Sequence, residues 1–407
     1  MELKSNTSDL GGPRVNNGIV EFPSYLMRGG TSTGLVIDER HMPTNLELRE
    51  ELLRHLMGVP LDSALPGNRQ TTGLGRGPAT SNKVFLVQEE DGKSARRLIS
   101  TLAQLASDHS RIDWSVNCGN MSAALPLWAL DSGLLEFGAN GEGLIEIRNT
   151  NTGLMTEARM SMKDGQLSTA EIAGVDGSYP AVDLFLRDPI GSKTGMLLPT
   201  GSAQDSVLGH RVSCVDVAVP MVIVDAASFG MTASEPMREL EANSAFMREL
   251  KSVWVQAGLR MALKRRDGEL LTEEELSQSE TVPKVCIVGP PTYGGDIAVR
   301  YFTPQTAHAS MAVSGGCCLA AASLIPGTVA SDIARDLPAL HDVPSDVDVG
   351  IENPAGILEA TVTASMSGGA VSISRAAYRR SAQILMRGYT PIYRASPQLR
   401  EALARSA

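Results

Sequence analysis

The chain has 407 residues, of which 43% are hydrophobic and 20% charged, and its formal net charge is −10. This length exceeds one ordinary core and predicts two domains of about 200 residues each. The acidic balance and the aromatic content of only 4% disfavour nucleic acid as a partner. The five cysteines are odd in number and irregularly spaced, and the six histidines are scattered, so neither a disulfide framework nor a metal site is predicted.

The first 18 residues are polar and lack the apolar core of a signal peptide. No apolar run in the chain reaches transmembrane length. We therefore expect a disordered tail over residues 1–18, a cytoplasmic protein and no membrane partner. Homodimer and homotetramer both stay open.

In the first half, strand-like runs at 19–22 and 34–38 flank a turn, Met27–Thr33. Leucine spacing predicts a helix over 46–57. Residues 62–82 form a long irregular stretch rich in Gly, Thr and Ser, a kind of loop that is usually functional. A strand at 84–87 follows. An apolar helix then begins near Cys118 and runs to Leu130, where Pro126 would kink it if it lies past the first turn. Further strands are expected near 134–148, 155–162 and 169–173.

Residues 196–201 resemble a domain boundary, after which the pattern starts again. The expected elements are a strand region at 212–224, a helix at 234–263, a charged surface excursion at 265–283, strands at 284–288 and 296–302, a small-residue helix at 314–325, strands at 356–364 and 370–374, and a closing basic helix or tail.

The two halves share an order of strands, a basic residue and a central helix opened by a turn with Cys and Gly. We expect an α/β (α+β) chain of two similar domains with mixed sheets, and not a Rossmann fold. The N-terminal domain is placed at 19–198, with 385–407 as an optional completion, and the C-terminal domain at 199–384.

Cys118 lies between Asn117 and Gly119 where an apolar helical run begins. Unpaired N–H groups and the positive end of the helix dipole lower the pKa of a thiol placed there and favour the thiolate. The same N–H groups attract a carboxylate. The alternative is a small buried core residue, the commonest fate of a free cysteine.

Two of the basic residues that precede Cys118 are candidates for the site. In the turn at 27–33, Arg28 can hold a carboxylate bidentately beside glycines and hydroxyls, although an ordinary turn with a surface arginine is equally consistent. Lys83 ends the long loop next to an apolar strand. A lysine among apolar neighbours can lose its charge and act as a base, whereas the alternative is a solvated lysine.

In the second half, Ser314 and the Gly315 amide open the small-residue helix and are candidates for anion contact. Arg300 lies on a strand that leads to His308 and is a candidate for a second carboxylate clamp, while His308 is favoured as a structural hydrogen bonder. Cys317 and Cys318 are adjacent and point about 100° apart on a helix, so small core residues are favoured. Cys214 and Cys286 lie inside apolar strands and are expected to be inert.

Six motifs occur here in one order: Arg28-Gly-Gly-Thr-Ser, Asn82-Lys-Val, Asn117-Cys-Gly-Asn, Leu198-Pro-Thr-Gly, Asp216-Val-Ala-Val-Pro and Ile325-Pro-Gly-Thr. Together they resemble the PrpF family of methylaconitate isomerases, which also holds oxalomesaconate tautomerases and methylitaconate and aconitate Δ-isomerases. The resemblance spans about residues 20–395. It implies a diaminopimelate epimerase-like fold, in which each of two domains wraps a mixed sheet around a central helix.

The resemblance also implies an isomerase that works without metal or organic cofactor on a small anionic polycarboxylate. Lys83 and Cys118 match the implicated acid–base residues of the family, with the order of their action left open. Such a pair can take a proton beside a conjugated acid and return it elsewhere, so that the double bond moves or rotates. The residues expected to hold carboxylates are Arg28, Gly30, Thr31, Ser32, Asn117, Gly119, Asn120, Met121, Arg300, Ser314 and Gly315.

This chain departs from the family pattern at three places. It has Asn353-Pro-Ala-Gly where relatives carry His-Pro-Ser-Gly, Thr33 where they often carry Lys or Arg, and an unusual loop at 62–82. These departures leave the particular acid open. Two further readings stay open as well: a racemase or epimerase with thiols at Cys118 and Cys317, and a non-catalytic accessory protein of an iron–sulfur dehydratase.

Overall fold

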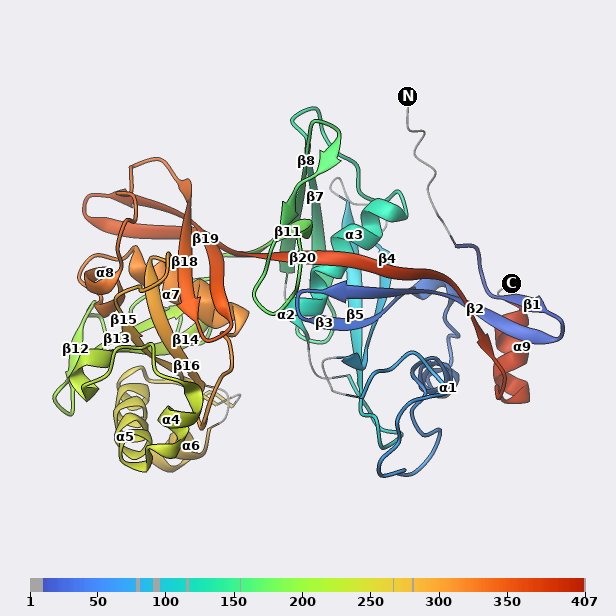
Figure 1. Ribbon diagram of the computed structural model, residues 1–407, viewed down its shortest axis with the longest axis horizontal. Coiled ribbons are helices and arrows are strands. Elements are labelled where there is room, and N and C mark those ends of the chain that lie inside the picture. Colours follow the sequence, from blue (N-terminus) through green and yellow to red (C-terminus); the bar gives the residue numbers. More distant parts are fainter. Residues whose placement is uncertain are drawn as a thin grey trace. The chain divides into compact units, whose positions relative to one another are not determined.

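The computed structural model describes residues 10–77, 81–90, 96–114, 117–153, 155–265, 267–279 and 282–405. The chain forms two compact units (Figure 1). Unit 1 consists of Met1–Leu184 and Arg380–Ala407, and unit 2 of Phe185–Arg379. The first boundary thus follows Leu184, against an expectation of residue 198. Residues 1–9 of the expected tail lie outside the described residues. None of the helices in the described ranges has the length and apolar character that a membrane crossing requires.

Unit 1 is built on a mixed sheet. Antiparallel pairs join β2 (Ile19–Gly29) to β3 (Ser32–Asp38), β4 (Lys83–Glu89) to β5 (Arg97–Leu105), and β7 (Glu142–Asn149) to β8 (Met155–Lys163). Parallel pairs join β3 to β4 and β5 to β7. The strands of a parallel pair need a crossover connection, and here the crossovers carry helices.

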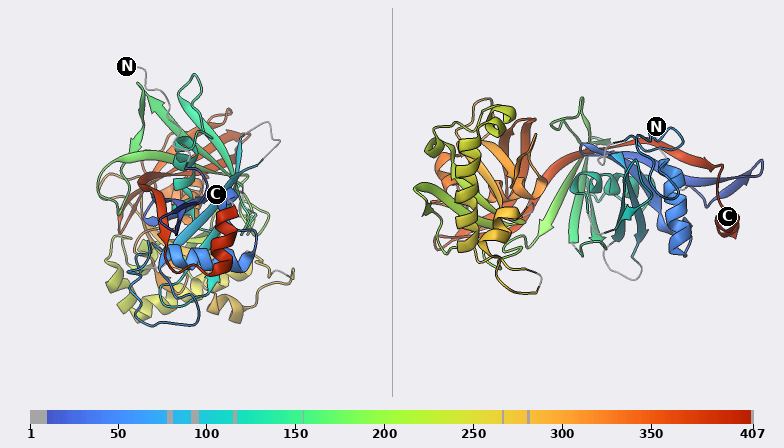
Figure 2. Two further views of the ribbon diagram at one scale, coloured as in Figure 1. Left: turned by 90° about the vertical axis from the view of Figure 1, so that its right-hand side faces the viewer. Right: turned by 90° about the horizontal axis from the view of Figure 1, so that it is seen from below.

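Helices lie on both faces of this sheet. On one face α1 (Leu46–Met57), capped by Asn45 and ended by Gly58 in the left-handed conformation, buries Leu52, Leu53 and Leu56 in the core. The C-terminal helix α9 (Pro397–Arg405) packs beside α1 (Figure 2, left). On the other face lie α2 (Gly119–Ser122) and α3 (Ala124–Asp131), which contact β2 and β3.

Unit 2 repeats the same strand order and directions. Antiparallel pairs join β13 (His210–Val217) to β14 (Val219–Asp225), β15 (Lys284–Gly289) to β16 (Ile297–Thr303), and β18 (Ser345–Asn353) to β19 (Gly356–Ser367). Parallel pairs join β14 to β15 and β16 to β18. The two halves of the chain are therefore two copies of one topology.

The central helix of unit 2 is α7 (Val313–Ser323), which contacts β13, β14, β18 and β19 (Figure 1). Its Gly, Ala and Cys residues are small enough to bring the helix close to the sheet, and all residues from Gly315 onward are buried. The opposite face is covered by α5 (Ser244–Arg260), whose Trp254 joins a core with Phe302 of β16.

The remaining elements complete the units. They are β1 (Arg14–Asn16), η1 (Glu39–His41), β6 (Ile112–Asp113), β9 (Gln166–Leu167), β10 (Thr169–Ala170), β11 (Tyr179–Arg187), β12 (Asp205–Val207), η3 (Ala226–Phe229), α4 (Met237–Ala242), α6 (Glu273–Gln278), β17 (Thr306–Ala307), α8 (Val329–Ile333) and β20 (Ala370–Ile392).

The predicted fold class is confirmed, because each unit holds a mixed sheet and a central helix. The predicted strand region 212–224 is confirmed, and it consists of two strands that turn at Ala218 (φ 64°). Two other regions hold elements that were not predicted. The charged excursion contains α6, whose capping box joins Thr272 and Glu275. Residues after Ser374 continue as the strand β20, which pairs first with β19 and then with β2, so long-range pairing overrides the local pattern.

Candidate active site

The turn predicted over Met27–Thr33 is much shorter than expected. Only Gly30 and Thr31 lie between β2 and β3, so the two strands form a hairpin in which Gly29 pairs with Ser32. A Cβ on Gly29 would lie 2.7 Å from the carbonyl oxygen of Asn120, and one on Gly30 (φ +53°) would lie 2.5 Å from Asn120 Oδ1. The two glycines therefore allow the hairpin to lie against the first turn of α2.

Polar contacts hold the hairpin and α2 together. Asn120 Nδ2 donates to Thr31 Oγ1 at 3.3 Å, and Arg380 Nε from β20 donates to Asn120 Oδ1 at 3.0 Å. Of the predicted site residues, Gly30, Thr31, Ser32, Asn117, Gly119, Asn120 and Met121 all belong to this hairpin or to the start of α2. The structure thus brings seven of them together around Cys118.

Cys118 is the N-cap residue of α2. Its Sγ accepts a hydrogen bond from the backbone N–H of Met121 at 3.5 Å and lies 3.8 Å from Ser32 Oγ. Asn117 Oδ1 accepts from the Cys118 N–H at 2.7 Å. A sulfur in the N-cap position is a hydrogen-bond acceptor for the helix, and its thiolate form is the better acceptor. Ser115 and Val116, which open the motif, lie outside the described residues.

The apolar run after Cys118 is two helices and not one. The break comes at Ala123, so Pro126 is the third residue of α3 and lies in its first turn, where a missing N–H costs little. Residues Ala124–Ala129 are all buried. The break spares the helix a kink and fixes Cys118 at the end of a short, separately capped turn.

Lys83 is the first residue of β4, and its side chain is only 7% exposed. Its neighbours Val84 and Leu86 belong to the core against α1, so strand alternation turns Lys83 to the face that carries α2. Burial lowers the pKa of Lys83, and the negative charge of Cys118 acts in the opposite direction. The amine and the thiol therefore interact electrostatically within unit 1.

Arg28 does not share this face of the hairpin. Gly29 faces α2, so alternation along β2 places Arg28 and its partner Thr33 on the opposite face. Arg28 Nη1 donates to the carbonyl oxygens of Gly30 and Ser381, and the guanidinium lies over the ring of Tyr179. Within the described residues, its Nε and Nη2 have no hydrogen-bond partner, and burial lowers its pKa.

The predicted site residues of unit 2 lie on opposite sides of the sheet at β16. Arg300 Nε donates to the Glu235 carbonyl oxygen at 2.6 Å, and Nη1 donates to the Val299 carbonyl oxygen at 2.9 Å. The next residue, Tyr301, faces Gly315 at the start of α7. Arg300 therefore lies on the opposite face from Ser314 and Gly315, and the structure does not bring it together with them.

The other four cysteines are completely buried. Burial raises the pKa of Cys214 to about 12 and places the pKa of Cys286 and Cys318 above the ordinary range of a thiol. Cys317 lies inside α7 with no exposed surface. A site that uses two thiols would need Cys317 exposed, whereas only Cys118 is partly exposed. The geometry therefore does not favour the racemase alternative.

The chain matches the family model described as PrpF protein over residues 19–393. The chain belongs to the PrpF family. Among curated relatives, it is 33% identical to the 4-oxalomesaconate tautomerase of Pseudomonas putida, with 87% of this chain and 92% of that protein covered. It is 31% identical to the (4E)-oxalomesaconate Delta-isomerase of Novosphingobium sp., with 92% and 99% covered.

Among solved structures, methylitaconate-delta-isomerase matches with a TM-score of 0.76 and 26% identity, covering 94% of this chain and 97% of that one. The family and its relatives identify this chain as an isomerase. This PrpF-family chain has no cluster of three or more His, Cys, Asp or Glu that could hold a metal ion within its described residues.

Three residues near the predicted site of this PrpF-family chain were missed by sequence reasoning. Tyr179, Arg380 and Ser381 come from β11 and β20, more than 50 residues away in sequence from every motif residue they contact. No local pattern marks them, because their role arises from strand pairing between distant segments.

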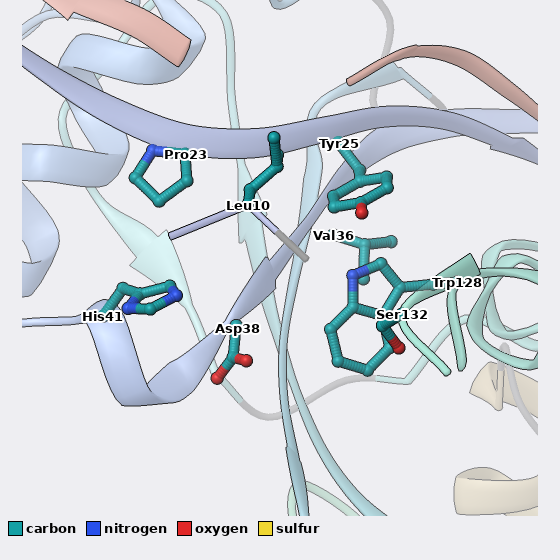
Figure 3. Close-up of a pocket in the computed structure, with 8 residues that line it drawn as sticks. All are labelled: Leu10, Pro23, Tyr25, Val36, Asp38, His41, Trp128 and Ser132. Atoms are coloured by element: carbon teal, nitrogen blue, oxygen red, sulfur yellow. The ribbon is translucent and has the colours of Figure 1, made fainter. Parts of the chain in front are cut away.

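A small pocket lies on the α3 side of unit 1 (Figure 3). Tyr25 and Trp128 line it, and the side chain of Leu10 lies over it. Its cavity of about 20 Å³ has room for a single water molecule. The indole N–H of Trp128 has no partner among the described residues, so a water there would satisfy it.

Proposed function

We propose that the chain is a cofactor-independent isomerase that moves or rotates a C=C bond in a small unsaturated di- or tricarboxylate. The observation that carries this proposal is the pairing of a buried lysine with an N-cap thiol: Lys83 faces the side of the sheet that carries α2, and the charge of Cys118 raises the pKa of Lys83 against the effect of burial. Relatives named for oxalomesaconate and a similar structure named for methylitaconate support the substrate class.

The chemistry requires one group to take a proton and another to return one. When a proton leaves the carbon next to the conjugated acid, the C–H electron pair delocalises into the carboxylate to give a dienolate. A proton then adds to a different carbon, which moves the double bond. Alternatively, the carbon–carbon bond rotates in the dienolate before a proton returns to the original carbon. The substrate neither gains nor loses a proton overall, so no oxidant or cofactor is needed.

A proton transfer between Lys83 and Cys118 can return both groups to their starting protonation states. Burial favours the neutral amine of Lys83, which is the form that can accept a proton. The Met121 N–H supports the thiolate of Cys118, which is the form left after the thiol has given a proton. If the lysine takes the first proton and the thiol gives the second, one transfer between them restores the starting state. The reverse order balances equally well.

Carboxylate groups of the substrate need fixed donors. In unit 1 these are the Ser32 and Thr31 hydroxyls of the hairpin and the amides that open α2. Arg28 lies on the other face of the hairpin, so we do not count it among these donors. We place 4-oxalomesaconate first among the candidate substrates, because two relatives are named for it.

The test is proton NMR in D2O with 4-oxalomesaconate, 2-methylaconitate, cis-aconitate and trans-aconitate in turn. We expect deuterium uptake and double-bond movement with at least one acid, and their loss in both Lys83→Met and Cys118→Ala. Absence of exchange with all four acids would contradict the proposal. Exchange that survives in Lys83→Met would remove the lysine from the mechanism.

A further inference from the structure

Arg380 is a buried charged residue that the proposed acid–base pair does not use. It lies on β20 between the stretch that pairs with β19 and the stretch that pairs with β2, and it is only 7% exposed. Gly29 of β2 faces α2 and pairs with Ala382, so alternation along β20 turns Arg380 to α2 as well. Strand register therefore brings a permanently charged guanidinium to the start of α2.

The guanidinium fixes the direction in which the Asn120 amide points. Arg380 Nε donates to Asn120 Oδ1 at 3.0 Å. A guanidinium offers donors only, so it selects the oxygen of the amide, and the NH2 group of Asn120 is turned to the hairpin. There Asn120 Nδ2 donates to Thr31 Oγ1 at 3.3 Å. The three side chains thus form a series of hydrogen bonds with one direction, from Arg380 through Asn120 to Thr31.

This direction decides what the Thr31 hydroxyl can do. A hydroxyl has one proton to donate and two lone pairs that accept. Within the described ranges of the chain, Thr31 Oγ1 accepts from Asn120 and donates to no group, and Thr31 is exposed at the tip of the hairpin. Its proton is therefore left to donate outward. A hydroxyl polarised through a series of hydrogen bonds that begins at a positive charge is also the stronger donor.

We propose that Arg380 is a positioning residue: by holding the Asn120 amide, it directs the hydroxyl proton of Thr31 to a carboxylate of the bound substrate. Arg380 acts through Asn120 and not on the reacting atoms. The inference rests on the substrate class of the proposed function and extends it to a residue outside all the sequence motifs. It also explains why a charged side chain is buried beside the first turn of α2, where the hydrogen bond to Asn120 offsets the cost of burial.

The test is a double-mutant cycle between Arg380 and Thr31. It measures the dissociation constant of tricarballylate, a saturated tricarboxylate that cannot isomerise, with the full chain by titration calorimetry. We expect this constant to rise about tenfold in Thr31→Val, which loses a hydrogen bond to a charged group, and about fivefold in Arg380→Met, which leaves the hydroxyl undirected. In the Thr31→Val background, Arg380→Met should change it less than twofold, because no hydroxyl is left to direct.

A neighbouring arginine of β20 supplies the matched control. Arg379 forms an ion pair with Glu359 at the surface, so Arg379→Met removes the same charge from the same strand and should change the dissociation constant less than twofold. If Arg380→Met does not fold, Asn120→Asp replaces it in the cycle. Its carboxylate still accepts from Arg380 but has no donor for Thr31, so the constant should rise at least tenfold, and by less in the Thr31→Val background.

An equal rise in both backgrounds would overturn the inference, and so would a wild-type protein that binds no tricarballylate or an Arg380→Met variant that binds it like the wild type. These results are distinguishable from failure of the proposed function. A chain with a non-additive cycle that exchanges no proton with any unsaturated acid would keep Arg380 as a positioning residue and refute the isomerase mechanism. A chain that isomerises an acid but gives an additive cycle would do the reverse.

Discussion

Unit 1 and unit 2 share one strand order, yet the starts of their central helices differ. In unit 1 the four-residue helix α2 is capped by the sulfur of Cys118, which is partly exposed. In unit 2 the longer α7 has no side-chain cap, and its cysteines are buried two and three residues beyond Gly315. A lysine opens the corresponding strand in both. The difference teaches that one topology can expose a thiol at the start of its central helix in one unit and bury every thiol of that helix in the other.

The largest expected effects come from removing the proposed acid–base groups of unit 1 and, for comparison, a thiol of unit 2. Cys118→Ala and Lys83→Met should each lower kcat/KM toward the responsive acid about 10³-fold, because a positioned acid or base contributes roughly 10²–10⁴. Cys317→Ala, the matched change in α7, should leave kcat/KM within about fivefold. Steady-state kinetics measures all three. Equal losses in Cys118→Ala and Cys317→Ala would favour a two-thiol enzyme.

The pH dependence separates the buried lysine from an exposed one. Burial lowers the pKa of Lys83 below its ordinary value of 10.5, so activity that needs its neutral amine should rise tenfold per pH unit and level off below pH 10.5. Protonating this group inside the fold costs stability, so the wild type should lose stability relative to Lys83→Met as the pH falls from 10.5 through the lowered pKa. Lys251→Met, at an exposed lysine of α5, is the control for the substitution itself.

Thermal melts of the three proteins between pH 7 and 10.5 measure the stability effect, and a pH–rate profile measures the effect on activity. A rate that keeps rising through pH 10.5 would show that Lys83 ionises like an exposed lysine, and it would contradict the role of burial.

Glycine substitutions test how closely a neighbouring strand packs against the start of the central helix in each unit. Gly29→Ala would place its Cβ within 2.8 Å of two backbone oxygens of α2, whereas Gly315→Ala would meet the edge of the Tyr301 ring at 2.6 Å. We expect Gly29→Ala to cost about 3 kcal/mol of unfolding free energy and Gly315→Ala about 1–2 kcal/mol, because a ring yields more easily than backbone. Gly11→Ala, with nothing nearer than 3.6 Å, is the control and should change it by less than about 0.5 kcal/mol.

Urea unfolding measures these free energies. The order of the two losses is the informative result. If Gly315→Ala is the more costly change, Tyr301 is held more rigidly against α7 than the backbone of β2 is against α2.

The smallest expected effect concerns the hydroxyl beside the thiol. Ser32→Ala removes the oxygen 3.8 Å from Cys118 Sγ and should lower kcat about threefold, within the range of one modest hydrogen bond. Ser24→Ala removes a hydroxyl of β2 that hydrogen-bonds to Thr390 of β20, and it should leave kcat unchanged. A loss above about 100-fold in Ser32→Ala would assign the hydroxyl a direct part in proton transfer.

Local sequence signals predicted the elements whose residues interact mainly with their neighbours. The leucine spacing predicted α1 with its true bounds, because the helix period is local, and the structure shows that both of its caps, Asn45 and Gly58, are local as well. The thiol at a helix start was equally readable, since a cysteine followed by glycine and an apolar run is a local pattern. β20 and α6 were missed for opposite reasons: the strand is defined by distant partners, and the short helix was hidden within a charged segment.

The sequence by itself determined the two-fold repetition, the small-residue central helices and the motifs that identify the family. Only the tertiary structure decided which residues share a face. Arg28 and Ser32 lie four residues apart in one motif, yet alternation along the hairpin turns them to opposite faces, while Tyr301 and Gly315 meet across 14 residues. Spacing along the chain fixes local conformation, but the direction of a side chain depends on strand register, which distant pairing sets.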